Sequence, residues 1–114
     1  NEVSSELEKS DIIFLLPHQL EFLPDRYTDL FINISSLHEM RPDQINYYFK
    51  QINRLTRKYF YLKEWIISKI PYEGIIVKET DYPIPRNWKK IYRRKCKVQT
   101  YFFEALFQID KQNK

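Results

Sequence analysis

Glycine is nearly absent from this chain, because Gly74 is the only glycine among 114 residues. A complete nucleotide-binding α/β domain needs several glycines where its backbone approaches phosphate or ribose, or where a helix packs tightly against a strand. The sequence therefore either adopts a different fold or lacks the glycine-rich half of such a domain.

Cysteine and long apolar runs are also scarce. Cys96 stands alone, which excludes an internal disulfide framework and a cysteine-rich zinc site. No run approaches the roughly 20 apolar residues needed to cross a bilayer. The first ten residues are polar and acidic, unlike the basic start and apolar core of a signal peptide. We expect a cytoplasmic protein without a membrane partner.

Residues that build a packed interior are abundant. Hydrophobic residues make up 43% of the chain and aromatic residues 17%, which is typical of a folded protein rather than a disordered one. A chain of 114 residues is long enough for one core but not for two domains.

The net charge of +4 comes largely from one basic block between Arg86 and Lys97. Basic side chains interleaved with aromatic ones occur on nucleic-acid surfaces, where they contact phosphates and stack on bases. They also occur on solvated edge strands, where lysines discourage aggregation. We favour the edge strand, and the alternative function is a small basic module that binds nucleic acid or an acidic protein.

The order of apolar segments predicts a largely parallel sheet. Continuous apolar runs are typical of buried strands in such a sheet, and the tail contains two further runs that suit an antiparallel pair. Prolines and Gly74 indicate a long loop from 66 to 87. The predicted strands are Asp11–Leu16, Tyr27–Ile34, Tyr59–Trp65, Trp88–Gln99 and Thr100–Ile109.

One amphipathic helix is predicted from Asp43 to Lys58. Its apolar residues recur every three or four positions, at Ile45, Tyr48, Phe49, Ile52 and Leu55, as expected for a helix with one buried face. Pro42 and Asp43 suit the start of a helix, because the proline lacks an amide that is not needed there and the carboxylate favours the positive end of the helix dipole.

The second predicted strand ends abruptly in polar and titratable residues. Ligands of open α/β sheets gather at the carboxyl ends of the strands, so this end of the strand is the candidate edge of a site. The residues concerned are Asn33, Ser35, Ser36, His38 and Glu39.

The segment Asn33-Ile-Ser-Ser-Leu-His-Glu-Met40, followed by Tyr47-Tyr-Phe49 and Tyr59-Phe-Tyr-Leu62, resembles the C-terminal half of class I S-adenosylmethionine-dependent methyltransferases, and within them the sugar O-methyltransferase family. The resemblance implies an α/β fold, namely the C-terminal part of a Rossmann-like sheet. Residues 1–114 would form one partial domain that contains strands three to seven, ends in an antiparallel hairpin and lacks the central strands.

The resemblance also implies roles for the polar residues. His38 is the candidate base that takes the proton of a sugar hydroxyl, since its unperturbed pKa lies near neutrality. Glu39 would orient the imidazole, act as the base itself if it is desolvated, or bind sugar hydroxyls. The alternative is that Glu39 only favours the start of the following helix and that His38 is a surface residue. Contacts to S-adenosylmethionine are expected from His18, Gln19, Leu20, Asn33 and Ser35, and a contact to the sugar or glycan from Ser36.

Purely structural roles remain open alternatives for these residues as well. Asn33, Ser35 and Ser36 equally suit turns and helix capping, and residues 18–20 equally suit an ordinary loop. No metal-binding spacing is present, so no metal is expected.

The family's glycine-rich loop and the acidic residue that holds the ribose have no counterpart in the sequence. We therefore expect a C-terminal fragment that is inactive alone and binds the cofactor weakly or not at all. The strand Asp11–Leu16 would lack its family neighbour. It would pair with another copy, add to an exposed edge or lie loosely, because unpaired strand edges invite association into homo-oligomers.

Overall fold

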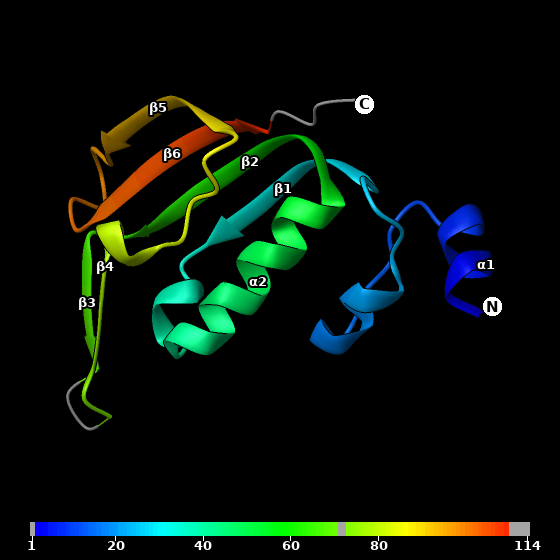
Figure 1. Cartoon of the computed structure of the whole chain (residues 1–114), viewed down its shortest axis with the longest axis horizontal. Helices are drawn as coiled ribbons and strands as arrows, with labels where there is room; N and C mark the ends of the chain where they lie inside the picture. The colour runs from blue at the N-terminus through cyan, green and yellow to red at the C-terminus, as the bar shows by residue number, and fades with distance from the viewer. Residues whose placement is uncertain (1, 71–72, 110–114) are drawn as a thin grey trace.

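A helix packs across one face of a four-stranded mixed sheet in the computed structural model, which describes residues 2–70 and 73–109 (Figure 1). The strand order is β1-β2-β6-β5, with β1 parallel to β2 and the other neighbours antiparallel. The elements of this layer pair are β1 (Thr28–Ile34), α2 (Pro42–Leu55), β2 (Thr56–Trp65), β5 (Trp88–Lys95) and β6 (Phe102–Ile109).

The parallel pair β1 and β2 is joined by α2, because two parallel strands need a long crossover connection. The predicted strands Tyr27–Ile34 and Tyr59–Trp65 are confirmed, as is the antiparallel pair in the tail, although β5 ends at Lys95. The predicted helix is also confirmed, but it ends at Leu55 rather than Lys58. Thr56 is fully buried opposite Thr28 of β1, so strand pairing ends the helix there.

The core lies between α2 and the sheet and is rich in aromatic rings. Phe60 of β2 is fully buried at its centre. Its ring centroid lies 5.9 Å from that of Phe49 on α2, 5.5 Å from that of Trp88 and 6.3 Å from that of Phe107. These contacts hold the helix on the sheet and thereby place the carboxyl ends of β1 and β2.

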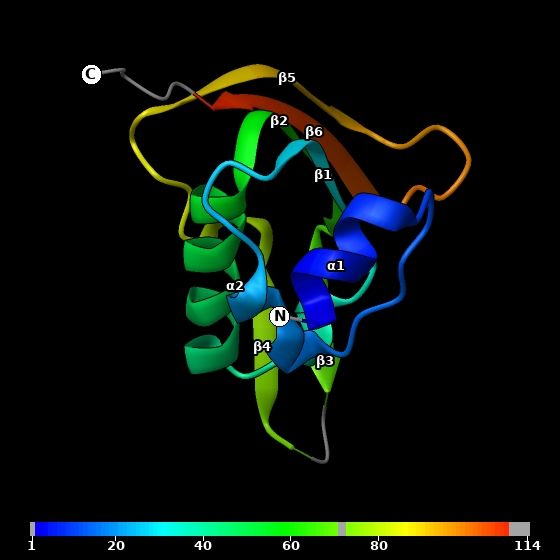
Figure 2. The same cartoon turned by 90° about the vertical axis from the view of Figure 1, so that its right-hand side faces the viewer.

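The predicted strand Asp11–Leu16 does not form, so the sheet lacks the first of the expected strands three to seven. The segment has no strand partner within residues 2–70 and 73–109. The 3₁₀ helix η1 (Pro17–Phe22) follows it directly, and the Arg54 guanidinium of α2 donates to the carbonyls of Leu20 at 3.0 Å and Leu23 at 2.8 Å. These contacts keep η1 against α2. Figure 2, seen from this side, shows η1 and the helix α1 (Glu2–Lys9) in front of the sheet.

Part of the predicted loop forms a second, two-stranded sheet. The strands β3 (Ile67–Ile70) and β4 (Ile75–Lys78) pair antiparallel and project from the end of the main sheet (Figure 1). Gly74 has a φ of +67°, a conformation that glycine adopts without strain. The prolines and Gly74 of this stretch predict a loop because they are typical of turns, but they carry no information about which short segments pair between the turns.

We predict that Phe60→Leu lowers the free energy of unfolding by about 1 to 3 kcal/mol, because it leaves a cavity among the rings of Phe49, Trp88 and Phe107. Urea unfolding followed by circular dichroism measures the change. Val98→Ala is the control, since Val98 is 94% exposed, and we expect it to alter stability by less than about 0.5 kcal/mol. Equal losses in the two variants would contradict this account of the core.

Candidate functional site

The chain turns sharply where β1 ends. Ser35 has a φ of +54°, and its amide donates to the carbonyl of Lys63 on β2 at 2.8 Å. The 3₁₀ helix η2 (Leu37–Glu39) follows and leads into α2. This arrangement places η2 at the carboxyl ends of the parallel strands, where α/β folds bind ligands.

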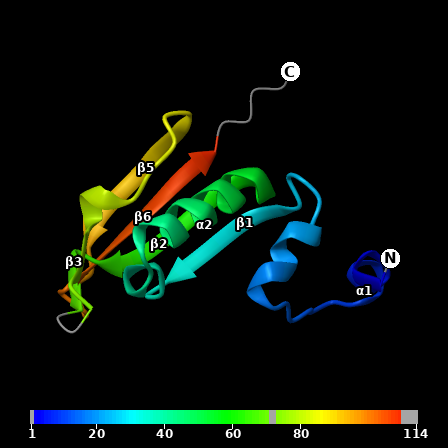
Figure 3. The same ribbon diagram turned by 60° about the horizontal axis from the view of Figure 1, so that its bottom comes forward.

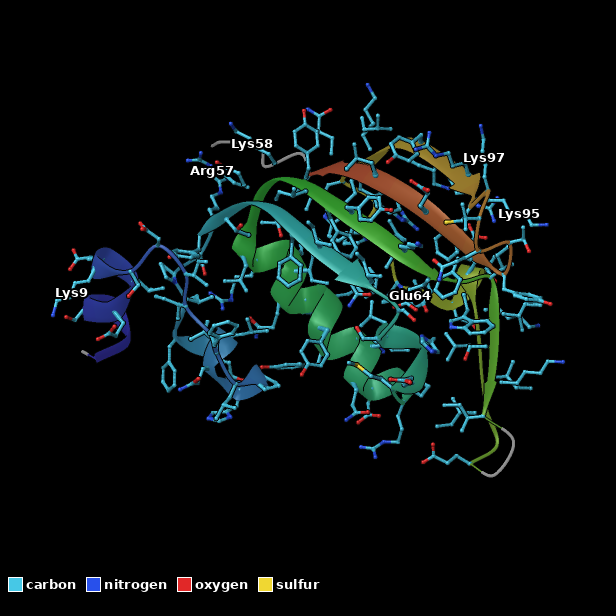
Figure 4. All side chains as sticks on the ribbon, turned by 180° about the vertical axis from the view of Figure 1, so that it is seen from behind. Lys9, Arg57, Lys58, Glu64, Lys95 and Lys97 are labelled. Carbon is cyan, nitrogen blue, oxygen red and sulfur yellow. The ribbon has the colours of Figure 1, made fainter. Side chains whose placement is uncertain are left out.

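A buried carboxylate organises this turn. Glu64 has no exposed surface, and one of its oxygens accepts hydrogen bonds from the amides of Ser36 and Leu37, both at 2.8 Å. Its other oxygen lies 2.8 Å from Nδ1 of His38. Figure 4 shows Glu64 near the carboxyl end of β2, away from Arg57 and Lys58 at the other end.

The carboxylate sets the orientation of the imidazole. Because a carboxylate accepts, Nδ1 of His38 carries the hydrogen in this contact, which leaves the lone pair of a neutral ring on Nε2. The nearest charged group to Nε2 is the Glu39 carboxylate at 3.9 Å, and the Glu39 side chain is 69% exposed. The pair His38–Glu64 therefore has the geometry of an oriented general base.

An aromatic residue borders the same pair, and a second one stacks on it. The ring of Trp65, the last residue of β2, lies 5.8 Å from the His38 ring, and Tyr101 stacks on Trp65 at 6.0 Å. The buried hydroxyl of Tyr82 has no hydrogen-bond partner among the described residues. Burial raises the pKa of Tyr82, and the charge of Glu64 adds to the effect.

A cavity of about 280 Å³ adjoins the turn, between η1, β1 and α2. The Asn33 amide nitrogen donates to Oγ of Ser36 at 2.7 Å, whereas Oδ1 of Asn33 is buried without a partner among the described residues. Such an orphaned acceptor suits a ligand that brings an N–H or O–H donor. The cavity is lined by Leu15, Leu16, Pro17, Leu20, Phe31, Asn33, Ser36, Leu37, Met40, Tyr48 and Ile52.

The structure brings some of the predicted site residues together and separates others. Leu20, Asn33 and Ser36 line the cavity. His38 follows the lining residue Leu37 on η2 but is not part of the lining. The remaining ones do not line it. Ser35 forms the turn through its backbone amide, and the side chain of Glu39 is exposed to solvent. The side chain of Gln19 accepts a hydrogen bond from the Leu16 amide at 2.7 Å. His18 is exposed.

Glu64 was not among the predicted residues, although the sequence contains a signal for it. Along β2 the buried positions alternate, and Glu64 falls in phase with Phe60 and Leu62. A carboxylate in phase with core residues needs hydrogen-bond partners inside the protein. The position of Glu64 in the alternation of buried residues along β2 was therefore the sequence signal for a buried carboxylate.

Part of the basic block is neutralised by nearby acids. Arg93 forms two hydrogen bonds to Glu79, at 2.7 and 2.5 Å, and Arg94 contacts Glu104 at 3.2 Å.

In the described parts of the chain, no helix is long and apolar enough to cross a membrane. The same residues contain no cluster of three or more side chains able to hold a metal ion.

Comparisons with known proteins relate the chain by fold. No protein-family model matches it, and no curated protein does. The crystal structure of the PH0226 protein from Pyrococcus horikoshii OT3 aligns with 96% of this chain at 15% identity and a TM-score of 0.67, and this chain spans 65% of its length. A "putative type 11 methyltransferase" from Sulfolobus solfataricus aligns with 98% of this chain at 16% identity and a TM-score of 0.55, over 68% of its own length. The chain therefore has a methyltransferase-like α/β fold with a mixed sheet.

We predict that Glu64→Gln destabilises the protein by about 1 to 3 kcal/mol, because an NH₂ group replaces one acceptor and leaves a buried donor unpaired. Urea unfolding measures the loss. Long-range ¹H–¹⁵N spectra should also show neutral His38 protonated at Nδ1 in the wild type, with this tautomer preference weakened in the variant. The matched control is Glu39→Gln, which changes an exposed carboxylate and should leave both readouts unaltered.

Proposed function

We propose that this chain is the acceptor-side portion of an S-adenosylmethionine-dependent O-methyltransferase whose parent enzyme methylates a sugar hydroxyl. The observation that carries the proposal is the His38–Glu64 pair at the carboxyl ends of β1 and β2. The methyltransferase-like fold and the sequence resemblance support the reaction class. The sugar substrate rests on the resemblance alone.

The pair suits the removal of a proton from an alcohol. A hydroxyl is a poor nucleophile until a nearby base takes its proton. In the proposed reaction Nε2 of His38 accepts that proton as the hydroxyl oxygen attacks, and Glu64 keeps the Nδ1 hydrogen and stabilises the imidazolium that forms. S-adenosylmethionine, when bound, supplies an electrophilic methyl group. The Glu39 carboxylate is exposed to solvent and lies 3.9 Å from Nε2 of His38, where it would accept hydrogen bonds from other hydroxyls of the sugar.

The cavity beside the turn suits part of the cofactor. Its walls are mostly apolar, and the unpaired Oδ1 of Asn33 offers one acceptor to an amine or hydroxyl of a nucleoside. Leu20 would contact the base, as the resemblance implies. The glycine-rich loop that holds the methionine part in the family has no counterpart in these residues. We therefore propose that the 114 residues alone are inactive and bind the cofactor weakly.

Binding of S-adenosylhomocysteine to the chain tests the cofactor assignment. We expect a dissociation constant in the millimolar range, about −4 kcal/mol, because one part of the ligand finds a site. In ¹H–¹⁵N spectra the shifts should concentrate at Leu20, Asn33 and Ser36, and Asn33→Ala should weaken them. His18→Ala is the control. Tight stoichiometric binding would contradict the proposed inactivity, and unshifted signals at the cavity would contradict the cofactor assignment.

Turnover by the parent enzyme tests the base. We expect His38→Ala to lower kcat by about 10² to 10⁴, the usual contribution of a general base. Glu64→Gln should lower kcat less and displace the pH profile, because Glu64 acts by positioning His38. Glu39→Ala should raise KM more than it lowers kcat. Unchanged kcat in His38→Ala would exclude His38 as the base.

A further inference from the structure

A basic groove lies at the carboxyl ends of β2 and β5. Its volume is about 350 Å³, and its walls come from β2, from the facing ends of β5 and β6 and from the turn between those two strands. Figure 3 shows this turn, in orange, at the end of the sheet from which β3 and β4 project. The amide of Ile66 donates to the carbonyl of Tyr101 at 2.9 Å, which ties the turn to the end of β2.

The groove has an excess of positive charge. Four basic side chains and one acidic side chain line it, so the net charge of its lining is +3. The acid is Glu104, and the Arg94 guanidinium lies 3.2 Å from it, so these two charges compensate each other. Cys96 adds no negative charge, because burial raises the pKa of its thiol, which donates a hydrogen bond to Glu104 at 3.6 Å.

Three lysines supply the remaining charge, namely Lys63, Lys95 and Lys97. Within residues 2–70 and 73–109 no carboxylate forms an ion pair with any of them. Nζ of Lys63 donates to the side-chain oxygen of Gln99 at 2.6 Å and lies 5.5 Å from the centre of the Phe102 ring. Both of these partners are neutral, so they position the ammonium group without compensating its charge.

The kind of cation in the groove favours phosphate over carboxylate as the bound anion. Lysine binds phosphate as a point charge, whereas the planar fork of arginine matches a carboxylate with two parallel hydrogen bonds. The arginine of the groove is Arg94, and Glu104 already engages it. The charge that remains for a ligand is therefore carried by lysine.

Aromatic rings connect the groove with the base. Lys63 and Trp65 are alternate residues of β2, so they project from the same face of the sheet about 7 Å apart along the strand. The Phe102 ring beside Lys63 lies 5.1 Å from the Trp65 ring, and the Trp65 ring lies 5.8 Å from the His38 ring. A ligand with its charged group in the groove would thus extend across Trp65 toward His38.

We propose that the acceptor is a phosphorylated sugar, whose phosphate is bound by Lys63, Lys95 and Lys97 while its sugar ring lies over Trp65 beside His38. This inference rests on the proposed function for the role of His38, and it adds the charge of the substrate. The phosphate takes no part in the chemistry. It would orient the reactive hydroxyl, because binding energy from a remote, non-reacting group positions the reacting one.

Titration of the chain with glucose 1-phosphate, followed in ¹H–¹⁵N spectra, tests the proposal. We expect shifts at the amides of residues 95–99 and at the indole N–H of Trp65. The indole of Trp88 is the internal control, since it is buried in the core and donates to Asn53, and it should not shift. Inorganic phosphate should shift the groove amides alone. A Trp65 indole that glucose 1-phosphate leaves unshifted would overturn the proposal, and the groove would then hold an adventitious ion only.

Charge-removing variants test the lysines. Lys63→Gln and Lys97→Gln should each raise the dissociation constant of glucose 1-phosphate about two- to fivefold, because each removes one exposed ionic contact. The matched control is Lys58→Gln, which removes the same charge at the other end of β2 (Figure 4) and should leave the constant unaltered. An equal effect in all three variants would show that only the net charge of the chain matters, and would contradict a phosphate site in the groove.

An oligonucleotide separates the proposal from the other source of phosphate. A single-stranded oligonucleotide that binds more tightly than glucose 1-phosphate and is weakened by Lys63→Gln and Lys97→Gln would overturn it in favour of a nucleic-acid surface. Binding of glucose 1-phosphate without measurable binding of the oligonucleotide would support it.

S-adenosylhomocysteine, added to the same samples, distinguishes a failure of this inference from a failure of the proposed function. Its expected shifts lie at the cavity, at Leu20, Asn33 and Ser36. Shifts at the cavity with no response of Trp65 to glucose 1-phosphate would overturn the phosphorylated acceptor and leave the cofactor assignment standing. The reverse result would support the sugar-phosphate site and contradict the cofactor assignment.

Discussion

The buried carboxylate of Glu64 is the interaction on which the rest of the site depends. It lies on β2 but binds the chain that leaves β1, through the amides of Ser36 and Leu37 and through His38. A buried charge is costly unless hydrogen bonds compensate it. The turn after β1 therefore has to fold around Glu64. In doing so, it sets the orientation of the imidazole and the starting point of α2.

Core and site are built on alternate residues of one strand. Phe60 and Leu62 of β2 face α2 and hold the layers together, and Glu64, next in the same phase, meets η2 instead of the helix. A shift of β2 by one residue would turn all three side chains to the other face of the sheet. The packing of the core thus determines where the carboxylate lies, and the stability of the fold and the geometry of the base depend on the same register.

The β1 side of the sheet differs from the β5 side in the kinds of side chains that it exposes to solvent. Basic residues cover β5, and some of them are paired with acids. Along β1 the amides and apolar side chains remain open, the adjoining cavity has apolar walls, and the segment beyond it exposes Ile12 and Phe14. These features have one physical consequence. Apolar surface and strand edges that are left in water favour binding of a ligand or of another chain. The proposed ligand site lies along this margin.

The sequence by itself determined β1, α2, β2 and the tail hairpin, because their periodicity is local and each buries a face that the pattern specifies. It also located the polar end of β1, including Asn33, Ser36 and His38. Only the tertiary structure decided that Asp11–Leu16 pairs with no strand among the described residues, that 67–70 pairs with 75–78, and that Glu64 meets His38 across 26 positions of sequence. Strand formation and a buried hydrogen bond both require a partner distant in the chain, and local periodicity carries no information about which partner is present.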